Sequence, residues 1–345
     1  MPSDFKIAGE TVAPGSRKTV SIPLSRLPDG TRMTLMTKII NGKHDGPVMF
    51  VSGAIHGDEI IGTEIVRRLS KLKTINSLRG TLILIPVVNT YGFITLSRYL
   101  PDRRDLNRCF PGRAGGSLGS QLAYTFMTEI VERCTFGIDL HSGAIHRENL
   151  PQIRASLGNN VVDEMAKAFG ASIIINSNTR DGSLRQVAQE TGCDMLLYEA
   201  GEALRFNELS IRIGVKGVLN VMRHLGMLKN TTTKTKPHVA PISSGSQWTR
   251  APMGGIMRAY FGLGDKVLEG DLLAHISDPL GEENVTIVAE SSGIVIGRTN
   301  LPIVNKGDAL FHIANLNKLD AGADSLDKLL AYTENDPLHA NQEII

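Results

Sequence analysis

The stretch SGAIHGDEIIGTEI, residues 52–65, joins two segments of different hydrophobic pattern. The four residues just before it, Val48–Val51, form a continuous apolar run, which is typical of a strand buried on both faces of a sheet. After the turn, apolar side chains recur at helical spacing: Ile60, Ile61, Ile65, Val66 and Leu69. In an open sheet of parallel strands, ligands bind at the carboxyl ends of the strands. The turn that carries His56 and Glu59 is therefore a candidate site.

Strands and helices alternate along the rest of the first 228 residues. The hydrophobic pattern predicts further strands at 80–89, 135–143, 171–177 and 194–202, and helices at 58–72, 119–134, 161–170, 182–192 and 210–228. Before residue 45, polar and apolar residues alternate in patches, which predicts antiparallel strands at an edge of the main sheet. The sequence thus predicts an α/β domain over 1–228, with a mostly parallel mixed sheet covered by helices.

After Met227 the pattern changes. Residues 229–247 are rich in Thr, Ser and Pro and are predicted to be a linker, and 248–316 show short strands with glycine turns. Two segments, GDKVL at 264–268 and GDAL at 307–310, form a weak repeat that resembles the halves of a biotinyl/lipoyl-like barrel-sandwich. The hairpin between them has no modifiable lysine, so we expect a lid or an oligomerisation role for this all-β domain. Residues 317–345 are a predicted C-terminal tail.

The composition excludes several classes of function. Lys and Arg total 37 against 35 Asp and Glu, so the chain has no field that would attract nucleic acid or an anionic membrane. The sequence shows no signal peptide and no apolar run of the ~20 residues that span a bilayer. The three cysteines include no C-x-x-C pair, which indicates reduced thiols in a cytoplasmic protein. No G-x-G-x-x-G follows the first apolar strand, which disfavours a dinucleotide-binding enzyme. We expect a homo-oligomer.

The spacing of His56 and Glu59 lets both side chains converge on one point from a tight turn. Imidazole and carboxylate together suit Zn²⁺, with each ligand at about 2.0–2.2 Å. The flanking glycines, Gly53 and Gly57, allow the backbone to bend there. The alternative is that His56 caps the following helix and Glu59 is a solvated carboxylate in its first turn.

A third ligand candidate follows a separate apolar strand. In GIDLHSG, residues 137–143, His141 is expected at the same edge of the sheet as His56. Asp139 lies two residues earlier on the same face of that strand, where it can orient the histidine ring. Two histidines and one glutamate would leave a zinc ion one open position, which is typical of a catalytic site. The alternative is a buried histidine with ordinary hydrogen bonds.

A further strand ends on an acidic residue, Glu199, in LLYEAGE. A carboxylate beside a metal-bound water can take its proton and deliver it to a leaving amine. Glu202 is the near alternative, although its position suggests that it points elsewhere. The structural alternative for Glu199 is an exposed loop carboxylate.

The segment SRYLPDRRDLNRCFPGR, residues 97–113, holds five arginines and lacks helical or strand periodicity. It is therefore predicted to be a long loop at the ligand edge of the sheet. Guanidinium groups bind carboxylates bidentately, and one near a metal can stabilise an oxyanion. The alternative is a salt-bridged surface loop.

The chain resembles the succinylglutamate desuccinylase/aspartoacylase group of zinc deacylases in four motifs that occur in the same order: HGDE (56–59), DLNRCFPG (105–112), DLHSG (139–143) and YEAGE (198–202). The resemblance covers about residues 40–228, and the β domain at 248–314 matches the smaller C-terminal domain of that family. It implies a zinc-carboxypeptidase-like fold for the first domain.

The resemblance also implies roles for individual residues. It makes His56, Glu59 and His141 the ligands of one zinc ion per chain, and Glu199 the general base and acid.

It implies that Asn107 and Arg108 hold a substrate carboxylate and that Arg98 polarises the scissile carbonyl, although Arg103 and Arg104 of the same loop leave that assignment open. The stretch HRENLPQIRA, residues 146–155, would line the pocket, with Arg154 as a further substrate contact.

These observations predict a zinc-dependent amidohydrolase that cleaves a small N-acyl amino acid, with the acyl group left open. A second reading is a zinc carboxypeptidase that acts on a peptide C-terminus such as an acidic tail. A third is a non-catalytic binding protein with the β domain as its interaction surface, and the complete set of His56, Glu59, His141 and Glu199 argues against it.

Overall fold

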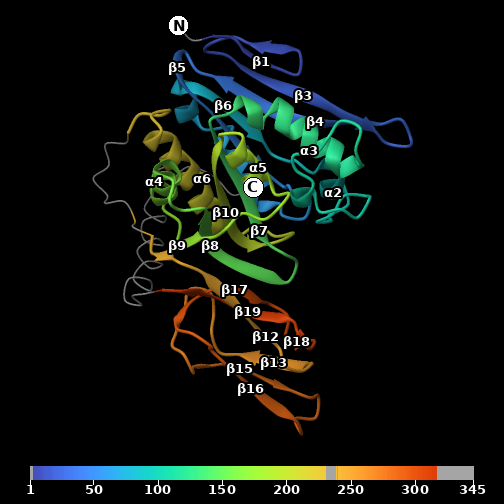
Figure 1. Cartoon of the computed structure of the whole chain (residues 1–345), viewed down its shortest axis with the longest axis vertical. Coiled ribbons are helices and arrows are strands. Elements are labelled where there is room, and N and C mark those ends of the chain that lie inside the picture. Colours follow the sequence, from blue (N-terminus) through green and yellow to red (C-terminus); the bar gives the residue numbers. More distant parts are fainter. Residues whose placement is uncertain (1–2, 231–237, 239, 317–345) are drawn as a thin grey trace.

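The computed structural model describes residues 3–230, 238 and 240–316 (Figure 1). The helices of this part are α1 (Ile61–Leu69), α2 (Thr90–Ile94), α3 (Leu118–Glu129), α4 (Asn160–Phe169), α5 (Leu184–Glu190) and α6 (Glu208–His224), with the 3-10 helices η1 (Lys73–Ser77), η2 (Leu106–Arg108) and η3 (Val131–Arg133). The strands up to residue 202 are β1 (Phe5–Ile7), β2 (Glu10–Val12), β3 (Arg17–Arg26), β4 (Arg32–Asn41), β5 (His44–Gly53), β6 (Arg79–Ile85), β7 (Phe136–Gly143), β8 (Arg147–Ala155), β9 (Ile173–Asn176) and β10 (Asp194–Glu202).

Four parallel strands form the centre of the main sheet, in the order β10, β7, β5 and β6. Beyond β6 the antiparallel strands β4 and β3 continue to the edge, where the sequence places them. On the other side, β8 runs antiparallel to β10. The predicted α/β fold with a mixed sheet is thereby confirmed.

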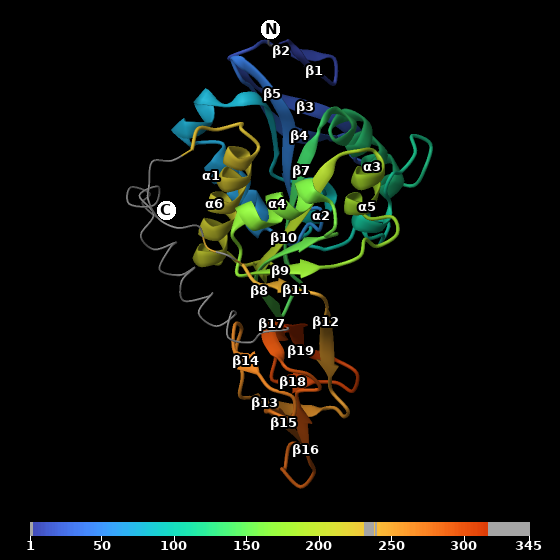
Figure 2. The same ribbon diagram turned by 60° about the vertical axis from the view of Figure 1, so that its left-hand side comes forward.

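Alternate residues of the central strands point to opposite faces of the sheet, and each face has its own hydrophobic core. Met49 and Val51 of β5 face a core that includes residues of α1, α4 and α6, whereas Phe50 faces a core built with α3 and α5. Figure 2 shows α1 and α6 on one side of the sheet and α3 and α5 on the other. The buried runs are apolar throughout because both faces are covered.

Strand β8 was not predicted as a strand, although its residues were expected to line the pocket. Pro151 explains this, because proline has no N–H for a ladder and argues against a central strand. In the structure Pro151 lies where the pairing of β8 with β10 changes register, between Gln152 and Asn149. The irregularity accommodates the proline, and the strand resumes on either side of it.

The C-terminal strands are β11 (Ile242–Ser243), β12 (Ser246–Arg250), β13 (Gly255–Ala259), β14 (Lys266–Val267), β15 (Leu272–Ser277), β16 (Asn284–Val288), β17 (Gly293–Thr299), β18 (Ile303–Val304) and β19 (Ala309–Asn315). Strands β16, β15, β13 and β18 form a separate four-stranded antiparallel sheet. The main sheet extends through β8 into β17, β19 and β12. The C-terminal all-β domain is therefore joined to the first domain by backbone hydrogen bonds as well as by the chain.

The domain limits given above stay a prediction. Part of the predicted linker, 231–237 and 239, and the whole predicted tail, 317–345, lie outside the described residues. At the end of the predicted linker, β11 pairs with β9 of the main sheet. In the described part of the chain no helix has the length and apolar character needed to cross a bilayer.

Candidate active site

The turn after β5 brings His56 and Glu59 over the carboxyl end of the sheet. Its glycines are needed for close packing rather than for bending, as a Cβ on Gly57 would lie 2.0 Å from the backbone of Gly92. The left-handed backbone of this turn falls instead on Ala54, with φ of 51°. The prediction that the glycines supply the bend is therefore corrected.

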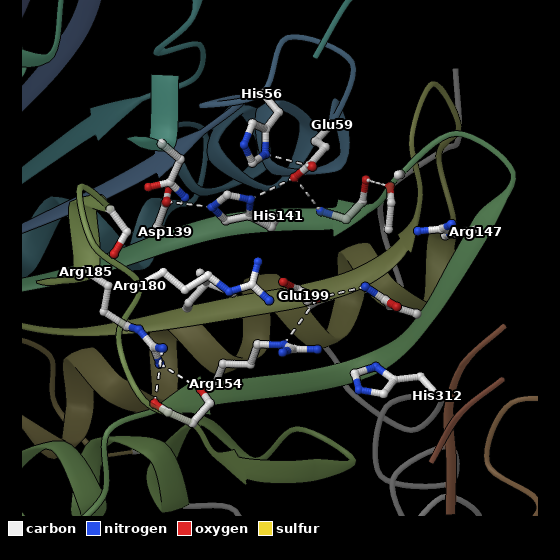
Figure 3. A pocket seen from close by; sticks show the side chains of 18 of the residues that line it. His56, Glu59, Asp139, His141, Arg147, Arg154, Arg180, Arg185, Glu199 and His312 are labelled. Atoms are coloured by element: carbon white, nitrogen blue, oxygen red, sulfur yellow. Dashed lines mark hydrogen bonds and ion pairs between the residues drawn. The ribbon is translucent and has the colours of Figure 1, made fainter. Parts of the chain in front are cut away.

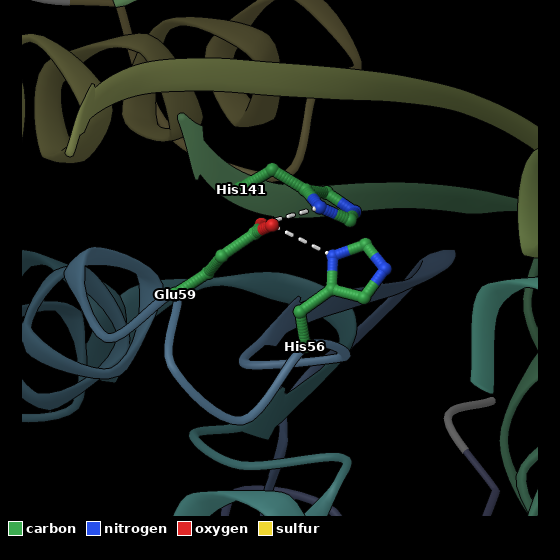
Figure 4. Close-up of side chains that lie close together, drawn as sticks. All are labelled: His56, Glu59 and His141. Carbon is green, nitrogen blue, oxygen red and sulfur yellow. Dashed lines mark hydrogen bonds and ion pairs between the residues drawn. The ribbon is translucent and has the colours of Figure 1, made fainter. Parts of the chain in front are cut away.

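Three side chains from two strand ends meet at this turn (Figure 4). One ligand atom from each of His56, Glu59 and His141 lies within 4.8 Å of the other two. All three residues are buried. The predicted ligand set is thus brought together, although the residues are up to 85 positions apart (141 − 56).

Glu59 lies between the two imidazoles. Its Oε1 is 2.8 Å from His56 Nδ1 and its Oε2 is 2.8 Å from His141 Nδ1. Burial alone would raise the pKa of Glu59, but the adjacent histidines hold that pKa well below its usual range. Burial would likewise lower the pKa of both histidines, yet the neighbouring carboxylates raise it. The cluster therefore favours positive charge at the point where the three side chains meet.

The far nitrogen of each imidazole contacts a different carboxylate. His141 Nε2 lies 2.7 Å from Asp139, which also accepts a hydrogen bond from Ser52 Oγ at 2.8 Å. His56 Nε2 lies 3.0 Å from Asp105. Such carboxylates fix the ring orientation and leave the opposite nitrogen, here Nδ1, to face a metal.

Asp139 occupies the predicted orienting position, whereas no role behind His56 was predicted for Asp105. Asp105 lies at the start of η2 and accepts a hydrogen bond from the backbone N–H of Asn107 at 2.9 Å. An aspartate two residues before an asparagine in this loop was the feature of the sequence that could have indicated such a fixed position. An aspartate in such a cap is held rigidly.

The donor set fits a metal better than it fits a closed hydrogen-bond network. His56 Nδ1 is close to Glu59 but has no hydrogen-bond partner among the described residues. A buried nitrogen of this kind is rare unless a ligand completes it.

The two alternatives for this turn are excluded. Helix α1 has Ile60 as its N-cap with no side-chain hydrogen bond, so His56 does not cap it. Glu59 is 2% exposed and is not solvated.

Glu199 lies beside His141 because the two are paired in the register of β10 and β7. Its Oε2 accepts a hydrogen bond from Asn149 Nδ2 at 2.8 Å and lies 3.4 Å from Arg154 Nε. Both contacts are made to Oε2, so Oε1 is the oxygen available to a ligand. Glu199 is a strand residue that lines the cavity, which excludes the exposed-loop alternative.

Glu202 does not line this cavity. Its two oxygens accept hydrogen bonds from the backbone N–H of His146 at 2.9 Å and from Asn300 Nδ2 at 3.0 Å. It therefore points away from the cavity, in the way its sequence position suggested, and it links the first domain to the C-terminal β domain, a role that was not predicted.

The arginine loop has two parts with different surroundings. Arg98 contacts Glu59 Oε1 at 2.8 Å and Asp105 Oδ2 at 3.1 Å, and Arg108 lines the cavity. Arg103 and Arg104 are exposed. The surface-loop reading thus describes Arg103, Arg104 and the exposed Arg113, but not Arg98 or Arg108.

Asn107 is buried beside the cavity. Its Oδ1 accepts a hydrogen bond from the backbone N–H of Leu184 at 2.9 Å, at the start of α5. Because this bond fixes the amide, Nδ2 remains as the donor for a ligand. Asn107 and Arg108 are thus presented together, as the resemblance implies.

The cavity has a volume of about 420 Å³ and is strongly basic on one side (Figure 3). Six arginines line it: Arg98, Arg108, Arg147, Arg154, Arg180 and Arg185. Among the described residues, Arg185 donates hydrogen bonds to Ser177 and to the backbone of Asn178, and burial beside Arg154 lowers its pKa to about 10. Arg180 has no ion pair within the described ranges.

The C-terminal β domain also contributes to the cavity wall through Ser246, Trp248 and His312. The rings of Trp248 and His312 are stacked with centroids 4.5 Å apart, and the guanidinium of Arg147 lies 5.6 Å from the Trp248 ring. His312 Nε2 contacts Ser246 Oγ at 2.8 Å. These residues were not predicted, since nothing in the sequence of the β domain indicates that it pairs with β8.

A family model for the succinylglutamate desuccinylase/aspartoacylase catalytic domain matches residues 45–225. The chain is 25% identical to an N-alpha-acetyl-L-2,4-diaminobutyric acid deacetylase from Halomonas elongata, over 86% of this chain and 90% of that protein.

Solved structures of other proteins have a similar fold over most of this chain. A product-bound ectoine utilization protein EutE (DoeB) from Ruegeria pomeroyi superposes with a TM-score of 0.79 at 25% identity, over 87% of this chain and 95% of that chain. A succinylglutamate desuccinylase/aspartoacylase from Rhodobacter sphaeroides gives a TM-score of 0.77 at 23% identity, over 87% and 96% of the two chains, which shows the shared fold. The family model spans more than half of this chain, and the chain therefore belongs to the succinylglutamate desuccinylase/aspartoacylase family.

Proposed function

We propose that this protein is a zinc-dependent deacylase that hydrolyses the amide bond of a small N-acyl amino acid. The observation that carries the proposal is the convergence of His56 Nδ1, Glu59 and His141 Nδ1, with Asp105 and Asp139 behind the two rings. These three residues would hold one zinc ion. When bound there, zinc would supply Lewis acidity for the amide carbonyl and for the attacking water.

Glu199 is the proposed general base and acid. Its Oε2 is held by Asn149 and Arg154, which keeps Oε1 directed at the space beside His141. From there the carboxylate would accept the proton of the attacking water and then donate it to the departing nitrogen. Proton transfer by a positioned carboxylate contributes about 10²- to 10⁴-fold to the rate.

Asn107 and Arg108 are the proposed anchor for the substrate α-carboxylate. The Asn107 amide is fixed by the backbone of Leu184, and the guanidinium of Arg108 lies at the same cavity wall. An amide and a guanidinium can together donate several hydrogen bonds to one carboxylate.

Arg98 is the proposed donor to the scissile carbonyl. Two carboxylates, Glu59 and Asp105, hold its guanidinium next to the histidine cluster. Because this position is fixed before a ligand arrives, little reorganisation is needed as negative charge develops on the carbonyl oxygen.

The amino-acid side chain of the substrate is proposed to be anionic. Arg154, Arg180 and Arg185 line the cavity, and within the described part of the chain Glu199 is the carboxylate that pairs with this group, through Arg154. Arg154 and Arg185 are partly buried and Arg180 is exposed at the cavity wall, and an anionic ligand group would form charge-assisted hydrogen bonds with these guanidinium groups. The Halomonas elongata relative is named for a diaminobutyric acid derivative, whose side-chain amine would be repelled by these guanidinium groups. We therefore favour N-acyl aspartate or N-acyl glutamate for this chain.

Metal analysis and a substrate panel test the proposal. Protein purified without chelator should contain about one zinc per chain, and His56→Ala should contain almost none. Near-zero metal in both, even after zinc is added back, would refute the metal site.

The panel compares N-acetyl and N-succinyl derivatives of aspartate, glutamate and 2,4-diaminobutyrate with a peptide that has an acidic C-terminus. Hydrolysis of the N-acyl aspartate or glutamate derivatives is expected. Hydrolysis of the peptide alone would favour the carboxypeptidase alternative instead.

A further inference from the structure

A row of paired residues crosses the junction between the two parts of the main sheet. Trp248 of β12 is opposite His312 of β19, and His312 is opposite Gly297 of β17. Gly297 is in turn opposite Asn149 of β8. The row connects the C-terminal β domain to the strand next to Glu199.

Asn149 makes the link to the reaction centre. Its Nδ2 donates a hydrogen bond to Glu199 Oε2 at 2.8 Å. The orientation of the amide is fixed by chemistry, because an ionised carboxylate only accepts hydrogen bonds. The amide oxygen, Oδ1, therefore faces the opposite way, towards β17.

Gly297 leaves room for that amide oxygen. A Cβ at this position would lie 2.9 Å from Asn149 Oδ1 and 3.2 Å from His312 Cβ. Contacts of a Cβ shorter than 3.0 Å are essentially absent from real structures, so a neighbouring group would have to shift, and the Asn149 amide at the end of its side chain is the one that moves most easily. Gly297 does not have a positive φ, and its lack of a side chain serves this close approach rather than an unusual backbone conformation.

We propose that Asn149 is a positioning residue for Glu199, and that Gly297 of the C-terminal β domain is the position that allows Asn149 to adopt this role. The inference rests on the proposed role of Glu199 as base and acid. It makes the β domain part of the catalytic apparatus, beyond the lid or oligomerisation role expected from the sequence.

The positioning acts on one oxygen of Glu199. With Oε2 bonded to Asn149, rotation of the carboxylate is restricted and Oε1 stays beside His141. Loss of the Asn149 contact would allow the carboxylate to turn towards Arg154, which already lies 3.4 Å from Oε2. The substrate anchor at Asn107 and Arg108 comes from a different loop, so the effect should fall on kcat rather than on KM.

A double-mutant cycle of Gly297→Ala and Asn149→Ala tests the inference. Each single variant is expected to lower kcat about tenfold to a hundredfold, which is part of the full contribution of about 10²- to 10⁴-fold from acid–base catalysis, with KM changed less than about threefold. In Asn149→Ala the amide is absent, so adding Gly297→Ala should cause little further loss. Gly245→Ala is the matched control, because a Cβ there meets no atom within 4 Å and its φ is not positive.

Zinc content and thermal unfolding midpoint should stay at wild-type values in all variants. Additive losses of kcat in the double variant would overturn the inference, as would a Gly297→Ala enzyme with wild-type kcat. Glu199→Gln provides the separate test of the proposed function: if that variant keeps full activity, Glu199 is not the base, whatever the cycle shows.

A crystal structure of Gly297→Ala gives a readout that does not require activity. The inference expects the Asn149 amide to be displaced from Glu199. An unchanged hydrogen bond between Asn149 Nδ2 and Glu199 Oε2 would refute it.

Discussion

The two sides of the cavity differ in how their charges are neutralised. On the histidine side, Glu59 contacts both imidazoles and Arg98, and each far ring nitrogen has its own carboxylate. On the arginine side, Glu199 is the acidic neighbour of Arg154 and Arg185, whereas Arg180 has no ion pair among the described residues. The histidine side (the first side) is therefore preorganised for a cation and the arginine side (the second side) for an anion, and Glu199 lies at the boundary between them.

Removal of a proposed metal ligand on the histidine side should have the largest effect on activity. We expect His56→Ala to lose zinc and at least about 10³-fold in kcat/KM, because two remaining donors bind the ion poorly and the Lewis acid is lost. Atomic absorption and kinetics on the same preparation measure both. Activity retained in metal-free protein would break the assignment of this side to a cation.

Substitution of Glu199, at the boundary between the two sides, should have the next largest effect on activity. Glu199→Gln should lower kcat by about 10²- to 10⁴-fold, because the amide cannot accept and return a proton. Zinc content should not change, since Glu199 is not one of the three converging residues. Loss of zinc in this variant would instead place Glu199 on the cation side.

Substitution of Asp105 tests whether the carboxylate behind His56 contributes to metal binding. Asp105→Asn should weaken zinc binding by about 10- to 100-fold, as removal of a carboxylate behind a ligand imidazole does. Competition with a chelator of known affinity measures the change. Asp102→Asn, an exposed carboxylate of the same loop, is the control and should leave zinc affinity unaltered.

The second side should discriminate by substrate charge. Arg180→Met is expected to raise KM for an N-acyl aspartate or glutamate by about tenfold, the value of one hydrogen bond to a charged group. For a substrate with a neutral side chain KM should hardly change. The exposed Arg103→Met is the control. Equal losses for both substrates would remove the distinction between the two sides.

His312, at the edge of the second side, is expected to affect the pH dependence of stability rather than the reaction. Burial and the nearby Arg154 and Arg180 lower its pKa to about 3 from 6.5. The unfolded chain therefore binds an extra proton below about pH 6.5, and stability falls as pH falls towards 3, by up to about 1.4 kcal/mol per pH unit. In His312→Phe this part of the slope should be missing, as chemical unfolding between pH 6.5 and 4.5 would show. An unchanged slope would contradict the lowered pKa.

The sequence revealed the histidine side more completely than the arginine side. His56, Glu59 and Asp139 follow strand ends or share a strand face, so the period of a strand and the direction of a parallel sheet suffice to bring them together. Arg180 lies in the loop after a predicted strand and Arg185 lies on a predicted helix, but neither pattern indicates that the side chain faces the cavity. Asn149 lies on a strand that Pro151 concealed.

The sequence by itself determined the α/β class, the family motifs, the ligand candidates and Glu199, because hydrophobic periodicity and residue order are local properties. Only the tertiary structure decided that β17 pairs with β8, that Trp248 and His312 border the cavity, and that Gly297 makes room for Asn149. These features depend on the register between strands about 150 residues apart in the chain, and no local pattern encodes such a pairing.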